Sequence, residues 1–365
     1  MKKGFALLLS LALMVTLLAG CGGAPSSSSS DTSTSSSSSS SSASGSSSDA
    51  SLPEDSSSRS ESSSDVADKT PVNVVALKGP TAIGMVGLMD AQDQGAAAND
   101  YSFTLAAAPD DIVGLVTTGA VDIAAVPANL ASVLYQKTEG AVNMLAVNTL
   151  GVLYIVERGD TVQSIADLAG KTVYATGQGS TPEYALHYIL EKNGLDDVTV
   201  EYRTEHAELA TLLASGEIDL ALLPQPFVTT VLQKDDSLRV ALDLTEEWNA
   251  ASEGESDLVM GGLIVRKEFA QAHPEAVEAF LREYADSVAF VNDEVAAAAA
   301  LCERYDIIPA AVAEQAIPDC NIVCLTGDDM RASVEKFFEV LYNADPASVG
   351  GALPDEAFYY VGAAE

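Results

Sequence analysis

Basic residues are scarce in this sequence. Lys and Arg total 18 against 53 Asp and Glu, and the formal net charge is -35. A protein that follows nucleic-acid phosphates, or that adsorbs to anionic lipid headgroups, needs a basic surface. The composition therefore argues against nucleic acid as a partner and against direct electrostatic binding to a membrane.

Histidine, cysteine and aromatic residues are also few. The three His stand at no ligand spacing of a recognisable motif, so we expect no metal site and no cofactor. Aromatic residues make up only 6% of the chain, but 47% of it is hydrophobic, which is enough for an aliphatic core of two-domain size. Among Cys302, Cys320 and Cys324, either the first two form a disulfide or Cys320 and Cys324 are buried as small hydrophobic residues, and at least one thiol stays free.

The N-terminus has the features of a secretion signal. Lys2 and Lys3 precede an apolar run over residues 5–18, and small residues lead directly into Cys21. This order is typical of a bacterial lipoprotein signal, and the run is shorter than the about 20 residues that a membrane-spanning helix needs. We expect a signal peptide over residues 1–20, with a lipid on Cys21 as the membrane anchor; the alternative is a membrane helix that ends in a cysteine.

A Ser-rich segment follows the lipidation site. Residues 21–69 contain almost no large apolar side chains, so they cannot bury enough surface to offset the entropy of ordering. We expect a disordered linker with a root-mean-square span of roughly 40 Å.

From residue 71 onward, short aliphatic runs alternate with helix-like segments. This alternation is typical of an α/β fold with mainly parallel sheets flanked by helices. The predicted strands cover residues 72–77, 103–108, 122–127, 144–149, 153–158, 172–177, 198–203, 219–224, 239–244 and 261–266. Apolar spacing of three and four predicts C-terminal helices over residues 275–291, 294–305 and 330–343.

Two stretches of the chain repeat one design. TTGAVDIAAVPANL (117–130) and ASGEIDLALLPQPF (214–227) share a Gly, an acidic residue, an apolar strand and a Pro. About 40 residues earlier, each has a strand that runs through Gly into a Thr/Pro turn, at residues 76–84 and 175–183. In parallel sheets, ligands bind beyond the carboxyl ends of the strands, at helix N-termini with free N–H groups. Recurrence in two halves favours a shared cleft over plain helix capping.

These segments resemble the solute-binding proteins of ABC importers, of the nitrate/sulfonate/taurine and thiamine-pyrimidine type with the type II periplasmic-binding fold. The residues that carry the resemblance are ALKGPTAIGM (76–85), DIAAVPANLA (122–131), NTLGVLYIV (148–156), GQGSTPEYAL (177–186), LLPQPFVT (222–229) and AIPDCNIVCLTGDDM (316–330). The resemblance implies two lobes joined by two crossing strands. Lobe I would comprise residues 70–152 plus 262–365, and lobe II residues 153–261.

The resemblance also implies where a ligand is held. The residues that match the family's contact positions are Gly79, Pro80, Thr81, Asn129, Asn148, Thr149, Gln178, Ser180, Thr181, Gln225 and Phe227. Relatives often carry Lys at the position of Gln178 and Glu at that of Gln225, so this cleft lacks an ion pair. Among the cleft loops only Lys78 offers a cation for a tetrahedral anion. We therefore expect a neutral, zwitterionic or heteroaromatic ligand, with Phe227, Tyr184 and Trp248 available for stacking unless they serve in packing.

The predicted function is capture of a small molecule between the lobes and its delivery to an ABC permease with its ATPase. We expect a monomer held by its lipid on the outer face of the cytoplasmic membrane, with a Gram-positive cell surface favoured. Two alternatives stay open: an enzyme of pyrimidine-precursor metabolism on the same fold, and a surface sensor without transport. Against the enzyme, the sequence lacks supported G-x-S-x-G, H-E-x-x-H and S-x-x-K motifs, and Gln178 stands where a Lys would serve.

Overall fold

The computed structural model describes residues 69–362. The expected signal peptide, the lipidation site Cys21 and the linker up to residue 68 lie outside the described residues. Within residues 69–362, no helix has both the length and the apolar character that crossing a bilayer requires.

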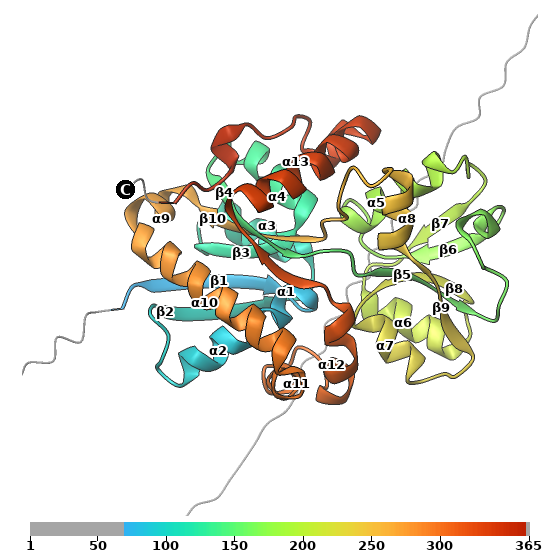
Figure 1. Cartoon of the computed structure of the whole chain (residues 1–365), viewed down its shortest axis with the longest axis horizontal. Helices are drawn as coiled ribbons and strands as arrows, with labels where there is room; N and C mark the ends of the chain where they lie inside the picture. Colours follow the sequence, from blue (N-terminus) through green and yellow to red (C-terminus); the bar gives the residue numbers. More distant parts are fainter. Residues whose placement is uncertain (1–68, 363–365) are drawn as a thin grey trace, which may run out of the picture. The chain divides into compact units, whose positions relative to one another are not determined.

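Two mixed sheets organise the fold (Figure 1). The first has the order β11-β4-β10-β3-β1-β2 and the second β7-β6-β8-β5-β9. The first sheet contains β1 (Pro71–Leu77), β2 (Asp100–Ala106), β3 (Ile123–Pro127), β4 (Val142–Thr149), β10 (Gly261–Arg266) and β11 (Ile322–Leu325). The second contains β5 (Leu153–Arg158), β6 (Thr172–Ala175), β7 (Thr199–Tyr202), β8 (Leu220–Pro224) and β9 (Leu238–Asp243). Each sheet with the helices that flank it is called a lobe below.

All ten predicted strands are present, and the α/β class is confirmed. The pairing is less parallel than expected, because β10 is antiparallel to β3 and β4, and β5 is antiparallel to β8 and β9. These two strands follow the segments in which the chain crosses between the sheets, at residues 150–152 and 252–260. Each therefore enters its sheet from the edge that is nearest the other lobe.

The helices connect the strands and cover the faces of the sheets. Those of the first lobe are α1 (Pro80–Ile83), α2 (Val86–Asp93), α3 (Pro109–Thr117), α4 (Ala128–Lys137), α9 (Lys267–Ala272), α10 (Pro274–Asp293), α11 (Val295–Arg304), α12 (Ala310–Ala316) and α13 (Gly327–Ala344). Those of the second are α5 (Thr181–Lys192), α6 (His206–Ser215), α7 (Phe227–Leu232) and α8 (Leu244–Ala251). Short 3-10 turns are η1 (Ile165–Leu168), η2 (Ile317–Asp319), η3 (Pro346–Val349) and η4 (Glu356–Phe358).

Alternation of side chains along the strands divides the core into layers. On β3, Ile123 and Ala125 belong to the cluster under α2 and α10, whereas Ala124 and Val126 belong to the cluster under α4 and α13. Successive residues of a strand point to opposite faces, so an uninterrupted apolar strand fills both layers. The predicted C-terminal helices correspond to α10, α11 and α13, and they pack on the first lobe.

Candidate functional site

Strand-to-helix loops of both lobes supply the candidate site. In the first lobe, β1 leads into α1, β3 leads into α4, and β4 ends at the crossing segment. In the second lobe, the parallel strands β7, β6 and β8 lead into α6, α5 and α7. Carboxyl ends of parallel strands share one sheet edge, so each lobe gathers its loops there.

The first lobe contributes a small group of uncharged polar residues. Asn148 and Thr149 end β4, both are buried, and the Thr149 hydroxyl donates a hydrogen bond to Asn148 Oδ1 at 3.3 Å. Thr81 lies in α1 and donates to the Leu77 carbonyl at 3.0 Å. Gly79 and Pro80 form the turn between β1 and α1, where Gly79 has a φ of 134° that a side chain would strain.

The loop between β6 and α5 forms the corresponding turn in the second lobe. The Ser180 hydroxyl donates to the Gly177 carbonyl at 2.7 Å, and Thr181 begins α5 with its side chain buried. Gly177 has a φ of 80°, and a Cβ there would come within 2.9 Å of Pro182 Cγ. Gln178, in contrast, is exposed. The loop therefore directs the Gln178 side-chain amide to solvent and buries the hydroxyls of Ser180 and Thr181.

The loop between β8 and α7 holds the predicted residues Gln225 and Phe227, and Phe227 packs against His206, which the sequence analysis did not assign to the site. Gln225 is buried, and its Oε1 accepts hydrogen bonds from the Thr229 backbone N–H and hydroxyl. The half-buried Phe227 packs its ring 5.2 Å from that of His206, which begins α6. His206 Nδ1 lies 2.5 Å from the Thr176 hydroxyl oxygen, just beyond the end of β6. Burial lowers the pKa of His206 to about 4.

The sequence analysis missed His206, because it considered the three histidines only as possible metal ligands. In the structure, the half-buried His206 ring joins two neighbouring loops through Thr176 and Phe227. The rule that selected the other loops also applied here, because His206 follows the carboxyl end of the predicted strand over residues 198–203.

Asn129 links the two lobes. Its Oδ1 accepts a hydrogen bond from the Thr181 hydroxyl at 3.2 Å, and its Nδ2 donates to the Gly179 carbonyl at 3.4 Å. The same Nδ2 donates to the Ser348 carbonyl at 3.0 Å. Two loops that the sequence predicted to share a cleft, one from each lobe, are therefore in direct contact.

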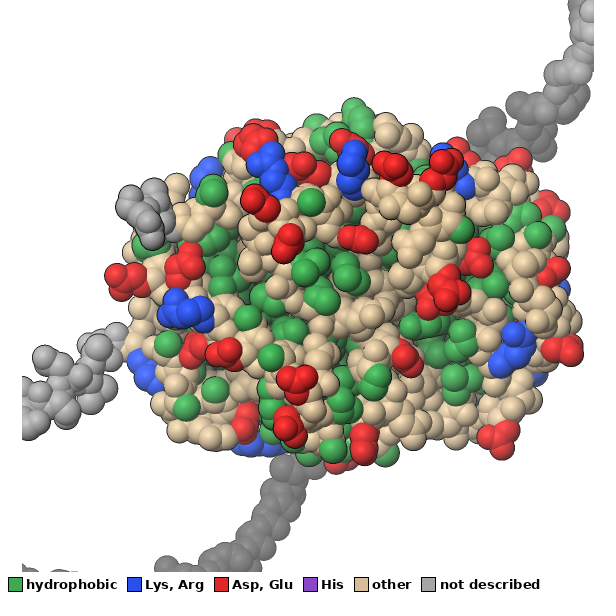
Figure 2. Space-filling model, viewed as in Figure 1, with side chains coloured by type: hydrophobic (Ala, Val, Ile, Leu, Met, Phe, Trp, Pro, Cys, Tyr) green, Lys and Arg blue, Asp and Glu red, His purple; other side chains and the backbone are tan. Residues whose placement is uncertain are grey.

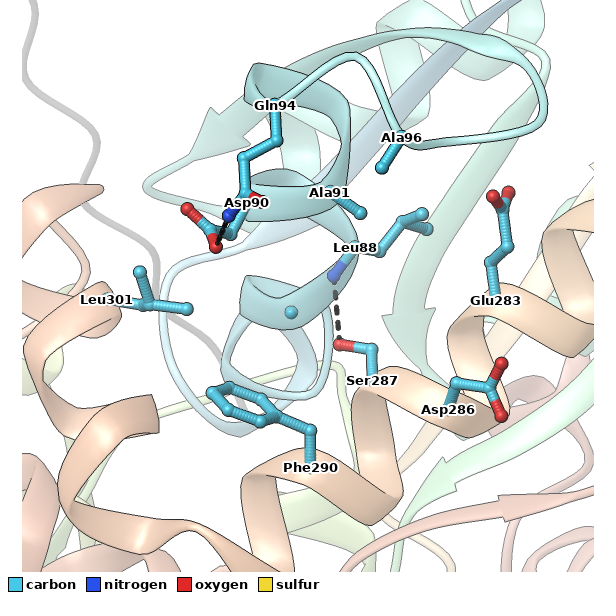
Figure 3. Close-up of a pocket in the computed structure, with 11 residues that line it drawn as sticks. Leu88, Asp90, Ala91, Gln94, Ala96, Glu283, Asp286, Ser287, Phe290 and Leu301 are labelled. Atoms are coloured by element: carbon cyan, nitrogen blue, oxygen red, sulfur yellow. Dashed lines mark hydrogen bonds between the residues drawn. The ribbon is translucent and has the colours of Figure 1, made fainter.

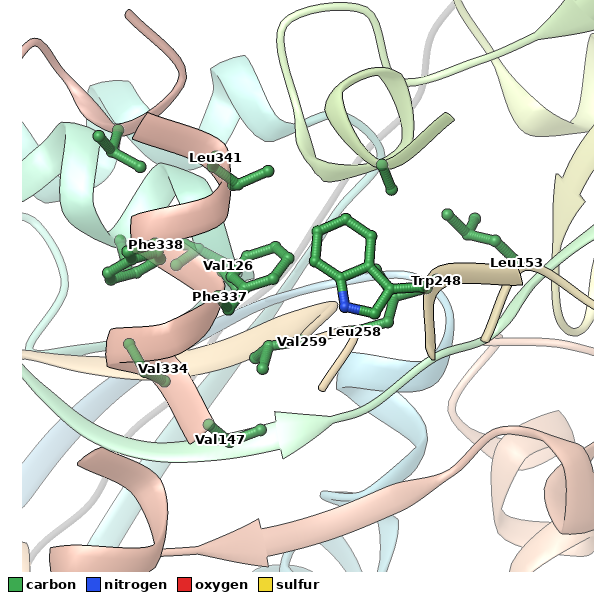
Figure 4. Packing of buried hydrophobic residues seen from close by; sticks show 14 of the residues in the cluster. Val126, Val147, Leu153, Trp248, Leu258, Val259, Val334, Phe337, Phe338 and Leu341 are labelled. Carbon is green, nitrogen blue, oxygen red and sulfur yellow. The ribbon is translucent and has the colours of Figure 1, made fainter. Parts of the chain in front are cut away.

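Further contacts join the lobes on two sides, and the two sides differ in character. The amide of Gln233, at the end of α7, donates to Gln315 Oε1 in α12 at 3.0 Å. On the opposite side, Trp248 of α8 packs 5.5 Å from Phe337 of α13, ring centroid to centroid, in an apolar cluster that continues through both lobes (Figure 4). Trp248 is fully buried, so its role in packing is confirmed.

The charge of Lys78 is balanced within the first lobe. Its ammonium lies 2.8 Å from Asp306 Oδ2 and holds the pKa of that carboxyl below its ordinary value. The buried members of the candidate site are amides and hydroxyls: Thr81, Asn129, Asn148, Thr149, Ser180, Thr181 and Gln225. The site residues offer hydrogen bonds without a net charge.

Other surface features lie away from these loops. A cavity of about 350 Å³ lies between α2, α10 and α11, and is lined by acidic and apolar residues such as Asp90, Glu283, Asp286 and Phe290 (Figure 3). A second, of about 480 Å³, lies near α9 and the C-terminal segment. Asp and Glu side chains are scattered over the face seen in Figure 2, interspersed with Lys and Arg.

The three cysteines of the described region are free thiols, so the disulfide between Cys302 and Cys320 that the sequence left open is absent. Cys320 is fully buried as a small hydrophobic residue, as the alternative expected, and so is Cys302, whereas Cys324 is only half-buried. Burial raises the pKa of all three thiols. Within residues 69–362, no group of three or more His, Cys, Asp or Glu side chains is placed to hold a metal ion.

Comparison with known proteins identifies the family. The model of the family described as NMT1/THI5 like matches residues 102–298, more than half of the chain. The chain therefore belongs to the NMT1/THI5-like family, and the resemblance seen in the sequence motifs is confirmed. A comparison with curated proteins found no match.

Several solved structures share the fold of this chain. An ABC transporter protein from Parabacteroides distasonis has a TM-score of 0.68 at 22% identity, over 80% of this chain and 99% of that one. The alkanesulfonate-binding protein SsuA from Xanthomonas axonopodis pv. citri, bound to MOPS, has a TM-score of 0.62 at 17% identity, over 79% and 96%. The aliphatic sulphonate-binding SsuA of Escherichia coli has a TM-score of 0.63 at 15% identity, over 80% and 92%.

Proposed function

We propose that this protein is the solute-binding component of an ABC importer, which captures a small molecule between its lobes and delivers it to a permease with its ATPase. The observation that carries the proposal is the hydrogen bond between Asn129 and Thr181. It joins two strand-to-helix loops, one from each lobe, of the kind that binds ligands in parallel sheets. Family membership and the transport roles named for the structural neighbours support the same role. A hinge that closes on a ligand gives a permease a distinct form to recognise.

The ligand is neutral, zwitterionic or heteroaromatic, and the contacts are the eleven residues that match the family's positions. The buried polar groups of the site are uncharged, and Lys78 is already paired with Asp306. An anion bound there would lose its hydration without gaining a free cation. This distinguishes the proposed specificity from that of the sulfonate-binding neighbours.

The protein works as a monomer on the outer face of the cytoplasmic membrane, with the lipid on Cys21 as anchor and the signal peptide removed. The acidic surface suits a Gram-positive cell envelope, because it keeps the protein away from anionic lipid and cell-wall polymers. Lobe I comprises residues 70–152 plus 262–365, and lobe II residues 153–261.

A ligand screen tests the proposal. The full chain, kept soluble with detergent, is melted in the presence of pyrimidines, flavins, amino acids, sulfonates and nitrate. We expect an uncharged or zwitterionic compound to raise the Tm, because a ligand that binds only the folded state stabilises it by mass action. Spectroscopic labels on Gln233→Cys and Gln315→Cys, whose native side chains lie 3.0 Å apart between the lobes, report whether the contact between the lobes changes.

Three outcomes would contradict parts of the proposal. Tight calorimetric binding of nitrate or an alkanesulfonate would overturn the predicted ligand chemistry. Conversion of a bound compound into a product would favour an enzyme, a class that the NMT1/THI5-like family includes. Binding that leaves the lobe contact unchanged would favour a sensor without transport.

A further inference from the structure

Two buried polar groups beside the candidate site have no partner. Tyr284 lies on α10 and Asn148 ends β4, and both are 0% exposed. Among the described residues, neither Tyr284 Oη nor Asn148 Nδ2 has a hydrogen-bond partner. Buried polar groups in native proteins are almost always hydrogen-bonded, so two orphans in one place require an explanation.

The two groups belong to one small region. The Asn148 amide is close enough to the Tyr284 hydroxyl to lower its pKa as a hydrogen-bond donor does, but the pair does not reach the geometry of a hydrogen bond. Burial raises the pKa of Tyr284, and the nearby amide acts in the opposite direction. The phenol therefore keeps its proton and remains a hydrogen-bond donor.

Glycines border both polar tips. A Cβ at Gly84 would lie 2.7 Å from Tyr284 Oη, and a Cβ at Gly261 would lie 2.3 Å from Asn148 Oδ1. Neither glycine has a positive φ, so their backbone conformations do not demand glycine, whereas the close approach of the polar atoms does. A side chain at either position would collide with the hydroxyl or the amide.

The missing partner is an acceptor. Asn148 Oδ1 already accepts from the Thr149 hydroxyl, so the group that lacks partners is the Nδ2 donor, together with the Tyr284 hydroxyl. The side chains around them are uncharged: Thr81, Thr149, Ile322 and Cys324. A buried carboxylate or sulfonate would meet no cation here, whereas an uncharged oxygen would gain hydrogen bonds at little cost.

We propose that Asn148 and Tyr284 form an acceptor-binding subsite, which holds an uncharged carbonyl oxygen of the ligand at the carboxyl end of β4. This inference rests on the proposed importer function and adds a chemical requirement to it. Tyr284 is a ligand contact that none of the sequence motifs indicated, because it comes from a helix nearly 140 residues away in the chain.

The first test uses Tyr284→Phe, which removes the hydroxyl and keeps the ring. In the ligand-free full chain, we expect the Tm to stay the same or rise, because an unpartnered polar group is lost. The matched control is Tyr101→Phe, since the buried Tyr101 hydroxyl donates to Glu283 at 2.6 Å and accepts from Asn99 at 2.8 Å. The control variant should melt at a lower temperature than the wild type.

The second test uses N-methylacetamide as an uncharged carbonyl probe and acetate as its anionic counterpart. With the chain labelled with nitrogen-15, we expect N-methylacetamide to shift the side-chain amide signals of Asn148, which Asn148→Leu identifies. Tyr284→Phe should weaken this binding roughly three- to tenfold, as expected for one lost hydrogen bond, and Tyr101→Phe should leave it unchanged. Acetate should leave the Asn148 signals in place.

Several results would overturn the subsite. One is a Tm loss in Tyr284→Phe equal to that in Tyr101→Phe, which would mean that the hydroxyl has a structural partner such as a buried water. Others are equal probe binding by wild type and Tyr284→Phe, or an equal response to acetate. None of these results would overturn the importer proposal. That proposal fails if no compound of the ligand screen stabilises the wild-type chain.

Discussion

The side chains of the second-lobe edge show how burial sets the chemistry of single residues. His206 is half-buried between Thr176 and Phe227, and its pKa is lowered from 6.5 to about 4 because its charged form loses hydration. The ring therefore stays neutral at physiological pH and can exchange hydrogen bonds without carrying charge.

This shift predicts a pH dependence of stability. Above about pH 6.5, His206 is neutral in both states and contributes nothing, whereas between pH 6.5 and 4 the unfolded chain takes up a proton that the folded chain refuses. Stability should therefore fall as the pH falls through this window, by at most about 3 kcal/mol because the ring is only half-buried. Urea unfolding at several pH values measures the loss.

The variant His206→Gln should remove this part of the pH dependence. The control is His187→Gln, because His187 is exposed on α5, and its unfolding curves should keep the wild-type pH dependence. Identical slopes for wild type and His206→Gln between pH 4 and 6.5 would show that His206 does not titrate as described.

The candidate site could be predicted in part from the sequence. Local strand-Gly-Thr/Pro patterns place Thr81, Ser180 and Thr181 in strand-to-helix loops, because such turns depend on residues that are neighbours in the chain. The partners of these residues follow from tertiary packing: nothing near Asn148 in the sequence indicates Tyr284, and nothing near Asn129 indicates Ser348.

Among the secondary-structure elements, the crossing segment between β4 and β5 is the most tightly constrained by its neighbour. A Cβ at Gly151 would lie 2.1 Å from Thr245 Oγ1 and 2.9 Å from Thr245 Cβ, at the start of α8. Gly151 does not have a positive φ, so the restriction comes from packing alone.

We expect Gly151→Ala to destabilise the protein by about 1–3 kcal/mol, the usual effect of overpacking. Adding Thr245→Gly should recover much of this loss, because it removes the atoms that collide. The matched control is Gly114→Ala in α3, where a Cβ meets nothing within 4 Å and where alanine favours the helix, so stability should rise slightly. Chemical denaturation of the wild type, Gly151→Ala, Thr245→Gly and the double variant gives the coupling free energy between the two positions, and its absence would contradict the close packing.

Most elements were predictable because their patterns are local. Most of the predicted strands are nearly continuous runs of β-branched residues or Leu, and all ten form. The strand β11 was missed, since Ile322–Leu325 has only four residues and follows a helical region, so its pairing with β4 depends on a distant partner. The antiparallel direction of β10 likewise depends on how the chain returns between the sheets.

At the scale of the whole described region, one apolar cluster extends from the first sheet to the second. Val126 and Val147 of the first lobe, and Leu153 of the second, belong to the same cluster as Trp248 and Phe337 (Figure 4). A shared core of this kind couples the unfolding of the parts that it connects.

We expect Trp248→Ala to cost about 3–5 kcal/mol, as large-to-small substitutions of buried aromatic residues do. Unfolding followed by circular dichroism should stay a single transition in the wild type, because one of the apolar clusters that cover each sheet continues into the other lobe. Trp248→Phe, which keeps most of the apolar volume, should cost less. Two separate transitions in the wild type, or a loss below about 1 kcal/mol in Trp248→Ala, would contradict a shared core.

In the proposed importer, the unequal composition of the two flanks between the lobes favours opening on one side. Pulling Trp248 away from Phe337 would expose apolar surface to water, whereas the bond between Gln233 and Gln315 exchanges for bonds to water at little net cost. The side with Trp248 and Phe337 would therefore act as the hinge, and the side with Gln233 and Gln315 would open. Solvent and solute would enter between α7 and α12, and the aromatic contact would stay free of water while the lobes open and close.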